Sequence, residues 1–523
     1  MLLAAARRGF SLRSNKWVLP VLDRILPLVA SHILIASAAL ALGLLLALPL
    51  GVFAARHRRV EQAVLGFASL VQTIPSLALL ALFYPLLLAF RTLTGAPISP
   101  LGFLPALLAL TLYALLPLLR NTVVALRGLD RDMLEAADGI GMTAWQKLWL
   151  VEAPLALPTV TAGVRTAAVW TIGAATLSTT VGQPSLGDVI FSGLQTQNWE
   201  LVIWGCLAAA ALALTADALL ALAERGISRG PRILWIVALA LFLAAPVAAL
   251  VSQIRPAQQV VTIGAKSFAE QYILARVIGH RLEAAGYAVR YKENLGSAVV
   301  FGAVASGEVD VYVDYAGTLW TNEMKRSDNP PRADMVAGVT AWTEAERSVT
   351  TLGPLGFENA YALAMRGDLA LARGIASIDD LRGAARTLTL GADLEFLDRP
   401  EWVTIREAYD LRFARQRTFN PTFMYDALKS GDADVISAFS SDGRIAADGL
   451  VVLTDPRGAI PSYDALLLLG PKAARDPQLV ATLRPLIGAI RVDRMREANF
   501  MVDRARDKAS PDVAARWLAR SLR

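Results

Sequence analysis

The 523-residue chain has little material for metal or thiol chemistry, with one cysteine and three histidines. Cys206 lies in an apolar run and is expected to pack there, and the scarcity of thiols is compatible with an oxidising compartment without proving one. His32, His57 and His280 are far apart, and no spacing of cysteine and histidine is typical of a metal site. We therefore expect neither a metal nor another cofactor.

Charge is also scarce, at 18% of residues, whereas hydrophobic residues make up 55%. This composition is too apolar for an ordinary soluble protein and too charged for a purely membrane-embedded one. The long apolar runs lie before residue 255. Basic residues are scattered or flank those runs, with no basic stripe interleaved with aromatics, so we expect no nucleic-acid partner. The composition predicts a membrane part followed by a globular part.

Signatures of catalysis and nucleotide binding are missing as well. We find no nucleophile–base set and no metal cluster, so we expect the chain not to be an enzyme. Gly264-Ala-Lys-Ser267 is similar to a phosphate-binding loop but lacks the upstream glycine and the Gly-Lys pair. Because no other Walker-type sequence is present, any ATPase must be a separate subunit.

Six apolar stretches before residue 255 are candidates for membrane-spanning helices. They are Ile33–Ala55, Ala63–Phe90, Leu101–Leu119, Thr166–Val181, Leu201–Ala223 and Ile233–Ile254. Pro75 and Pro85 are expected to kink the second stretch. The fourth is rich in small residues and is expected to face the interior of a bundle. Arg165 and Asp217 are candidates for an ion pathway, although we favour interfacial positions near the cytoplasmic ends of their spans.

The short loops indicate how these spans are oriented. Three basic clusters fall on one side of a six-span arrangement: Arg56, Arg58 and Arg59; Arg120, Arg127, Arg131 and Lys147; Arg225, Arg229 and Arg232. The positive-inside rule makes that side cytoplasmic and places the sequence after Arg255 outside. The basic segment 1–27 disagrees, since it would also lie outside. It does not read as a removable signal peptide, and Trp17–Leu28 is a candidate for a further interfacial or spanning element.

A charged insert, Glu135–Pro158, separates two of the apolar spans. Its sequence predicts two short helices around a glycine-containing turn, with Trp145 and Trp149 on one face of the second. Pro154 and Pro158 are expected to stop that second helix. An insert folded in this way is expected to be a docking element, and the alternative is an interfacial helix lying on lipid.

The insert resembles the coupling loop of ABC-importer permeases, which sits in a cleft of the ATPase subunit. The resemblance rests on a Glu-Ala-Ala tripeptide, a glycine after three further residues, and a Val-x-Ala-Pro end where the usual form has Ile-x-Leu-Pro. It implies two copies of a separate ATPase, working with a homodimer of this chain around the translocation path. The ATPase-coupling residues implied are Glu135, Ala136, Ala137, Gly141 and Pro154.

Residues 30–225 resemble permeases for glycine betaine, choline and related osmoprotectants. The resemblance rests on Leu48-Pro-Leu-Gly51, on Gln72-Thr-Ile-Pro-Ser76, and on Thr180-Val-Gly182 with Leu186-Gly-Asp188. It implies an all-α polytopic membrane domain of the type I ABC importer class over residues 28–225, in the plasma (inner) membrane of a bacterium. Residues 1–27 then form a basic N-terminal segment, and residues 226–256 form an extra transmembrane helix and a linker.

An internal repeat organises residues 257–523. Ala303–Val311 (AVASGEVDV) returns as Ala427–Val435 (ALKSGDADV), and the openings TIGA and TLGA of the two copies also match. The repeat predicts two similar α/β lobes of a hinged solute-binding domain, with a ligand at the carboxyl ends of strands between them. Tyr315 and Phe439 follow equivalent strands, so one aromatic ring from each lobe is expected to close on the ligand.

Four motifs in this part resemble binding proteins for choline, glycine betaine and carnitine, which enclose a quaternary ammonium group in an aromatic box. They are Phe268-Ala-Glu-Gln271, Asp314-Tyr-Ala-Gly-Thr318, Asn359-Ala-Tyr361 and Phe439-Ser-Ser-Asp-Gly443. The resemblance implies an extracytoplasmic two-lobed α/β domain of the type II periplasmic-binding-protein class. A trimethylammonium group donates no hydrogen bond, so the faces of aromatic rings are suited to recognise it.

The same resemblance assigns ligand-binding roles to individual residues. It implies Tyr315, Tyr361 and Phe439 as walls of the box, and polar contacts from Gln271, Thr318 and Asn359. Asp314 and Asp442 are candidates for neutralising the cation or for stabilising turns. For a further box tyrosine of the family, Trp342 is the candidate here, and Arg399 and Arg412 are candidates for binding a ligand carboxylate.

Three classes of function compete: an importer subunit, a membrane-anchored ligand sensor or receptor on the same binding fold, and a tethered extracellular enzyme. The coupling-loop resemblance favours the importer. We therefore predict the permease and substrate-binding subunit of an ATP-driven importer for choline, glycine betaine, carnitine or related betaines, typical of osmoprotection. The sensor remains an alternative, as does import of another betaine such as ergothioneine.

Overall fold

The computed structural model describes residues 18–96, 98–196, 198–228, 231–253, 260–393, 396–419, 421–504 and 507–522. Most of the basic segment 1–27 and the linker at 255–259 therefore lie outside the described residues. The chain forms two compact units, one of Met1–Ile190 with Ile203–Arg255, the other of Phe191–Val202 with Pro256–Arg523. Each unit is described by itself below.

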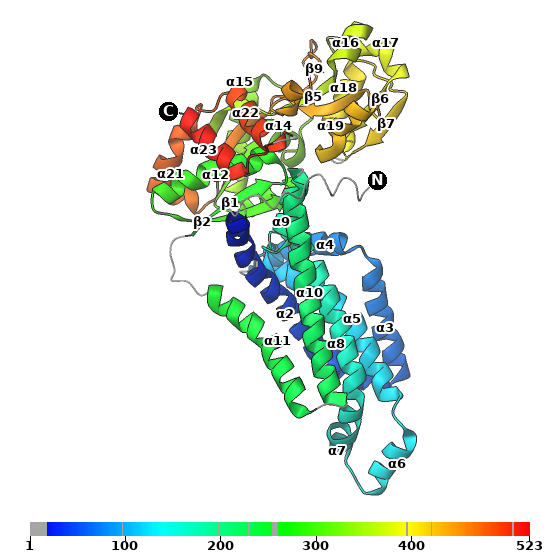
Figure 1. Ribbon diagram of the computed structural model, residues 1–523. Helices are drawn as coiled ribbons and strands as arrows, with labels where there is room; N and C mark the ends of the chain where they lie inside the picture. Colours follow the sequence, from blue (N-terminus) through cyan, green and yellow to red (C-terminus); the bar gives the residue numbers. More distant parts are fainter. Residues whose placement is uncertain are drawn as a thin grey trace. The chain divides into compact units, whose positions relative to one another are not determined.

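The described residues from Val18 to Gln253 are mainly helical (Figure 1). Its helices are α2 (Val18–Arg56), α3 (Arg58–Thr73), α4 (Ser76–Thr94), α5 (Phe103–Arg127), α6 (Arg131–Gly139), α7 (Ala144–Lys147), α8 (Ala153–Ala175), α9 (Gly187–Gln195), α10 (Trp199–Ser228) and α11 (Arg232–Gln253). Helices α2, α5 and α8 pack against one another, and small residues at their contacts, such as Ala39, Ala114 and Ala167, are fully buried. Small side chains let the helices approach closely.

Six helical stretches of the described residues are long and apolar enough to cross a membrane. They are Ile25–Arg56, Ser76–Thr94, Phe103–Arg127, Ala144–Val181, Trp199–Ile227 and Ile233–Val251. The predicted second span is wrong in its form, because Pro75 separates α3 from α4 instead of kinking one helix. Proline removes a backbone donor and keeps the preceding Ile74 extended. The fourth span begins well before the predicted Thr166, at α7 and α8.

The charged insert forms the two predicted short helices, α6 and α7, around a turn. Asp130 caps α6, Gly141 has a positive φ of 79° in the turn, and Thr143 forms a capping box with Gln146 at α7. The predicted stop at Pro154 and Pro158 is wrong, because a π-helical turn (Leu148–Glu152) joins α7 to α8. Pro154 lies in the first turn of α8, where its missing N–H needs no helical partner.

Arg165, Asp217 and Cys206, which lie in or beside the apolar spans, have surroundings that the sequence did not predict. Arg165 of α8 binds Asp217 through Nε and Nη2, at 3.0 and 3.1 Å, and Glu224 through Nη1, at 2.7 Å. This ion-pair group links α8 to α10, so Arg165 and Asp217 balance one another's charge. Cys206, expected to be packed, is exposed on α10.

The second unit contains two five-stranded sheets of the same design (Figure 1). Their strand orders are β2-β1-β3-β10-β4 and β7-β6-β8-β5-β9. The strands are β1 (Val260–Lys266), β2 (Ala288–Leu295), β3 (Val311–Tyr315), β4 (Thr350–Glu358), β5 (Tyr361–Arg366), β6 (Thr389–Ala392), β7 (Arg415–Thr418), β8 (Val435–Phe439), β9 (Leu450–Val452) and β10 (Asp464–Leu469). The sheet that contains β1 defines lobe 1, and the sheet that contains β6 defines lobe 2.

Helices surround the two sheets. They are α12 (Ala269–Ala284), α13 (Ser297–Ala305), α14 (Ala316–Thr318), α15 (Arg332–Arg347), α16 (Gly367–Arg373), α17 (Leu381–Ala384), α18 (Pro400–Ala408), α19 (Pro421–Ser430), α20 (Arg444–Ala447), α21 (Pro477–Leu483), α22 (Val492–Asp503) and α23 (Pro511–Ser521). In lobe 1 the central strand β3 pairs with β1 in parallel and with β10 antiparallel, and β10 also pairs antiparallel with β4. In lobe 2 the central strand β8 pairs with β6 in parallel and with β5 antiparallel, and β5 also pairs antiparallel with β9.

The chain crosses between the lobes twice, from β4 to β5 and from β9 back to β10. Both crossovers join the sheets near the carboxyl ends of β3 and β8, where Tyr315 and Phe439 are the last strand residues. The predicted equivalence of these two residues is therefore confirmed. The predicted fold class, a helical membrane part followed by a two-lobed α/β domain, is confirmed as well.

Candidate ligand-binding site

A cavity of about 410 Å³ is lined by residues from both lobes of the second unit. It lies at the carboxyl ends of β1, β3, β6 and β8, the edge at which ligands bind in open α/β sheets. Its volume is in the range of small-molecule sites. The aromatic residues that line it are Phe268, Tyr315, Tyr361, Phe439 and Tyr463, and the charged ones are Lys266, Glu270, Asp393, Arg399, Asp442, Arg444 and Asp503.

Three rings form one aromatic corner of the cavity. Tyr361 opens β5 directly opposite Phe439, the last residue of β8, so antiparallel pairing brings their ring centroids to 5.0 Å. Tyr463, just before β10, meets Tyr361 edge to face at 5.8 Å and 86°. On lobe 1, Tyr315 stacks on Phe268 with centroids 6.3 Å apart. Strand register and the second crossover therefore place these rings around one space.

The structure brings together every predicted ligand-binding residue except Gln271. Tyr315, Thr318, Asn359, Tyr361, Phe439 and Asp442 all line the cavity. Gln271 is buried behind it, where its amide donates to the Val313 carbonyl at 2.9 Å and to the Tyr315 hydroxyl at 3.1 Å. Gln271 thus supports Tyr315 from behind the cavity, and its predicted contact with a ligand stays a prediction.

The two aspartates considered as partners of a cation are already paired. Asp442 is bound by the Arg444 guanidinium, with Nη2 to Oδ2 at 2.7 Å, and accepts the Arg444 backbone N–H at 2.8 Å. Asp314 binds the Lys266 ammonium at 2.7 Å, with both side chains buried. Their charges are therefore compensated within the protein, and the turn-stabilising interpretation fits Asp442.

The remaining candidates divide between the cavity and the surface. Trp342 does not line the cavity but stacks on Phe301 at 5.6 Å, and the further tyrosine that lines the cavity is Tyr463. Arg399 lines the cavity, with its guanidinium 5.2 Å from the Tyr361 ring centroid. Arg412 is exposed and pairs with Asp410, away from the cavity.

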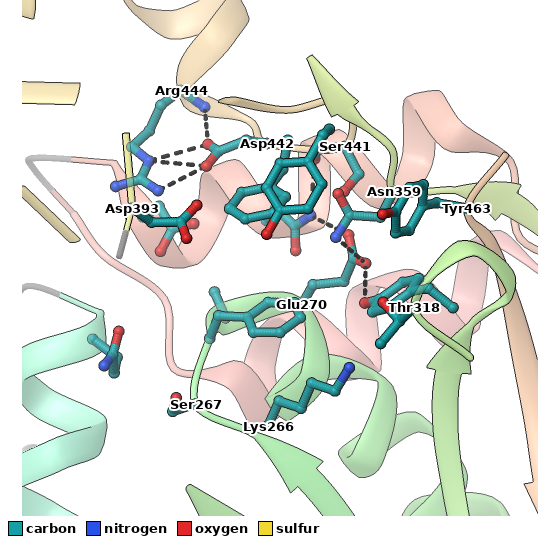
Figure 2. A pocket seen from close by; sticks show the side chains of 18 of the residues that line it. Lys266, Ser267, Glu270, Thr318, Asn359, Asp393, Ser441, Asp442, Arg444 and Tyr463 are labelled. Carbon is teal, nitrogen blue, oxygen red and sulfur yellow. Dashed lines mark hydrogen bonds and ion pairs between the residues drawn. The ribbon is translucent and has the colours of Figure 1, made fainter. Parts of the chain in front are cut away.

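Glu270 is the side chain that the sequence analysis missed and that has the most partners here (Figure 2). Its carboxylate accepts hydrogen bonds from the Tyr315 hydroxyl at 2.6 Å, from Asn359 Nδ2 at 3.1 Å and from Asn499 Nδ2 at 2.9 Å. Burial raises the pKa of the Glu270 carboxyl, while the hydrogen bonds from Ser441, Tyr315 and the two amides oppose that rise. Its position in the quoted Phe-Ala-Glu-Gln motif was the available signal.

Among the described residues, no group of three or more His, Cys, Asp or Glu side chains has the arrangement of a metal site. The cavity lining offers aromatic rings, amides and charged side chains. Rings attract organic cations through their negative faces, and such a lining is suited to a small ligand that carries both an alkylated ammonium group and polar atoms.

Comparison with known proteins places both parts of the chain. Residues 259–520 match the family described as the substrate binding domain of ABC-type glycine betaine transport system, and residues 47–229 match the binding-protein-dependent transport system inner membrane component. A solved structure described as a glycine betaine/carnitine/choline ABC transporter is 25% identical, with a TM-score of 0.45, over 50% of this chain and 100% of that chain.

Two curated relatives extend the comparison. The ergothioneine transport permease/ergothioneine binding protein EgtU of Helicobacter pylori (strain G27) is 28% identical, over 89% of this chain and 85% of the relative. The glycine betaine/carnitine/choline transport system permease protein OpuCB of Bacillus subtilis (strain 168) is 42% identical, over 38% of this chain and 85% of the relative. The chain thus belongs to the betaine-type ABC importers, as a transporter component rather than an enzyme, with a permease and a glycine betaine-type substrate-binding domain joined in one polypeptide.

Proposed function

We propose that the chain is the permease and substrate-binding subunit of an ATP-driven importer for quaternary ammonium compounds such as choline, glycine betaine or carnitine. The observation that carries the proposal is the aromatic corner of Tyr361, Phe439 and Tyr463, facing the same cavity as Tyr315. Each ring face contributes about 0.5–2 kcal/mol of attraction to a desolvated cation. Several such faces around one cavity favour a trimethylammonium group over a hydrated inorganic ion.

Ergothioneine is the second candidate ligand. It shares the trimethylammonium and carboxylate groups of betaines and adds a polar ring. The relative named for this compound matches both parts of the chain, whereas OpuCB matches the permease part. The cavity lining also includes the charged side chains Asp393, Arg399 and Asp503, which offer partners for further polar atoms of such a ligand.

The α6–α7 insert supports coupling to a separate ATPase, which membership of this family implies. Trp145 and Trp149 are 68% and 57% exposed, with ring centroids 5.6 Å apart, and Ile140 in the turn of the same insert is 74% exposed. Exposed apolar residues gathered on one element are typical of a protein contact. We propose Glu135, Ala136, Ala137, Gly141 and Pro154 as coupling residues, in a homodimer served by two ATPase copies.

The proposed location is the inner membrane of a bacterium, with residues 257–523 outside the cytoplasm. The basic residues near the ends of α2, α5 and α10 support this orientation, because short cytoplasmic loops carry an excess of arginine and lysine. Residues 28–225 form the proposed permease domain, and residues 226–256 supply the extra span and linker. Such an arrangement tethers the binding domain to its own permease.

Calorimetric titration of the purified full-length chain tests the ligand class. The panel is choline, glycine betaine, carnitine and ergothioneine, with 3,3-dimethylbutan-1-ol as the neutral counterpart of choline. We expect at least one cationic compound to bind, and choline to bind more tightly than its neutral counterpart. Binding of none of the panel, or equal binding of choline and the neutral alcohol, would contradict the proposal.

A further inference from the structure

Two buried glutamates occupy equivalent places in the two lobes. Glu270 is the second residue of α12, the helix that follows β1, and Glu401 is the second residue of α18, the helix that follows β6. Both residues are only 2% exposed. β1 and β6 are equivalent strands in the matching sheet orders, so the two carboxylates are related by the same internal repeat that relates Tyr315 to Phe439.

Each of these carboxylates accepts the hydroxyl hydrogen bond of a tyrosine in the cavity wall. The Tyr315 hydroxyl donates to Glu270 Oε1 at 2.6 Å, and the Tyr463 hydroxyl donates to Glu401 Oε1. Both tyrosine rings line the cavity. Of the two carboxylates, Glu270 borders the cavity, whereas Glu401 is not among its lining residues. Each glutamate is therefore hydrogen-bonded to a tyrosine whose ring lines the cavity, where a ligand would contact it.

We propose that Glu270 and Glu401 are specificity-determining residues, which position the Tyr315 and Tyr463 rings and raise their electron density, so that the cavity selects a cation over a neutral molecule of the same shape. A hydrogen bond to a carboxylate is charge-assisted and pulls the phenol toward phenolate character. Attraction between a cation and a ring depends on the negative charge of the ring face, and it strengthens in a buried site. This inference rests on the proposed function.

The remaining partners of the two carboxylates hold them in place, and these partners differ in charge between Glu270 and Glu401. Glu401 accepts a hydrogen bond from Thr321 Oγ1 of lobe 1 at 3.2 Å and pairs with Arg399 Nη1 at 3.3 Å. Within the described part of the chain, Glu270 forms no ion pair and is held by neutral donors. Because Arg399 offsets the charge of Glu401, the effect of Glu270 on cation selectivity is expected to be the larger.

Lys266 acts in the opposite sense on one of these rings. Its ammonium lies 5.4 Å from the Tyr315 ring centroid, where a positive charge draws on the same ring face. Asp314 binds that ammonium at 2.7 Å and compensates its charge. The carboxylate of Glu270 is therefore the partner of Tyr315 that leaves a net negative influence on the ring.

The test compares choline with 3,3-dimethylbutan-1-ol, in which a tert-butyl group replaces trimethylammonium, by calorimetry on the full-length chain. Glu270→Gln keeps the side-chain size and removes the charge. We expect it to weaken choline binding about tenfold, the loss of roughly one cation–ring contact, and to change binding of the neutral alcohol less than about twofold. Glu401→Gln is expected to act in the same direction with a smaller effect.

A double-mutant cycle separates action through the ring from a general effect on the fold. In a Tyr315→Phe background the hydroxyl is gone, so Glu270→Gln is expected to add little further loss of choline selectivity. Glu293→Gln is the matched control, since Glu293 is also a buried lobe 1 carboxylate but pairs with Arg276 at 2.6 Å outside the cavity. It is expected to leave the ratio of the two affinities unchanged.

The possible outcomes discriminate between the inference and the function on which it rests. If the wild-type chain does not prefer choline, the proposed function and this inference fail together. If it does prefer choline and both glutamine variants retain that preference, or lose both ligands equally, only this inference fails. Should Glu270→Gln not fold, Glu401→Gln and Tyr463→Phe decide the question by the same ratio.

Discussion

At the scale of single residues, we propose that the rings lining the cavity decide the affinity for the ligand. The ring centroid of Tyr361 lies no more than 5.8 Å from the ring centroids of Phe396, Phe439 and Tyr463. Tyr361 is therefore central to the aromatic corner. Tyr361→Ala is expected to cost about 1–3 kcal/mol of binding free energy, roughly ten- to a hundredfold in the Kd of choline. Tyr361→Phe is expected to cost less, because the ring face survives.

Calorimetry of these variants, with Trp342→Ala as the control, checks the prediction. Trp342 is an aromatic residue of the same domain that stacks on Phe301 away from the cavity. Its removal is expected to leave the Kd of choline unchanged. Equal losses in Trp342→Ala and Tyr361→Ala would show that the measurement reports domain stability rather than recognition.

The buried position of Glu270 predicts that binding depends on pH. Burial raises the pKa of the Glu270 carboxyl, so its protonation begins at a higher pH than for an ordinary glutamate. The protonated form lacks the negative charge, and choline affinity is therefore expected to fall as pH drops through that raised pKa. The titratable groups that interact with it are Tyr315 and Asp503, and the charged side chains Lys266, Asp442 and Arg444 line the same cavity.

Two variants test whether the pH dependence of choline binding is due to Glu270 or to Asp503. Burial also raises the pKa of Asp503, to about 7, with Arg444 opposing the rise. Removal of the Glu270 charge by Glu270→Gln is expected to flatten the acid side of the profile, while Asp503→Asn is expected to retain the part due to Glu270. A profile that is the same in wild type and Glu270→Gln would contradict the assignment.

The residues that sequence reasoning found and missed differ in one respect. Tyr315 and Phe439 end equivalent strands, so a repeat in the sequence was enough to place them at one edge. Tyr463 lies in the second crossover, which has no counterpart in the repeat, and its role depends on where that connection passes. The connection from strand to helix is longer before Glu401 than before Glu270. The two glutamates therefore do not align when the two copies of the repeat are compared without gaps.

At the scale of elements, prolines show why spans were easier to predict than their ends. Apolar composition over about 20 residues is enough to indicate a membrane helix. The effect of a proline depends on its position relative to a helix start: Pro75 precedes α4, Pro154 is in the first turn of α8, and Pro158 lies within it. Proline is tolerated inside membrane helices where neighbouring groups satisfy the freed carbonyl, and sequence does not show those neighbours.

The α6–α7 element is predicted to couple ATP hydrolysis in the partner subunit to transport by the permease. Gly141 has a φ of 79°, so Gly141→Ala strains the turn although no neighbouring atom crowds a Cβ there. With the partner ATPase in proteoliposomes, Gly141→Ala or Glu135→Ala is expected to reduce ligand transport per ATP hydrolysed. The Kd of the ligand is expected to stay unchanged, because the cavity belongs to the other unit.

An opposite pattern would exclude this role. If Glu135→Ala left transport intact and removed ligand binding, the insert would not be the coupling element. Lys147→Ala is a suitable matched control on the same element, since Lys147 binds Asp138 at 2.6 Å within the insert and carries no proposed contact with the ATPase. It is expected to retain coupling.

At the scale of the whole molecule, composition alone predicted the division into a membrane part and a globular part. The apolar runs end near residue 255, and the two compact units divide there apart from the segment Phe191–Val202. The orientation that we propose in the membrane rests on charge instead, because basic loops are retained on the cytoplasmic side. Since span six leaves the cytoplasm in this arrangement, the binding domain and the α10–α11 loop are predicted to lie on opposite sides.

Single cysteines provide the test of that orientation. Cys206 is exposed and must first be replaced, so that a new thiol is the one that reacts. Ser228→Cys, at the end of α10, is expected to resist a membrane-impermeant thiol reagent in intact cells and to react once the membrane is permeabilised. Ser327→Cys, on an exposed segment of the binding domain, is expected to react in both conditions. Labelling of Ser228→Cys alone in intact cells would reverse the orientation, and the binding domain would then lie inside the cell, where it could not deliver an external solute to an importer.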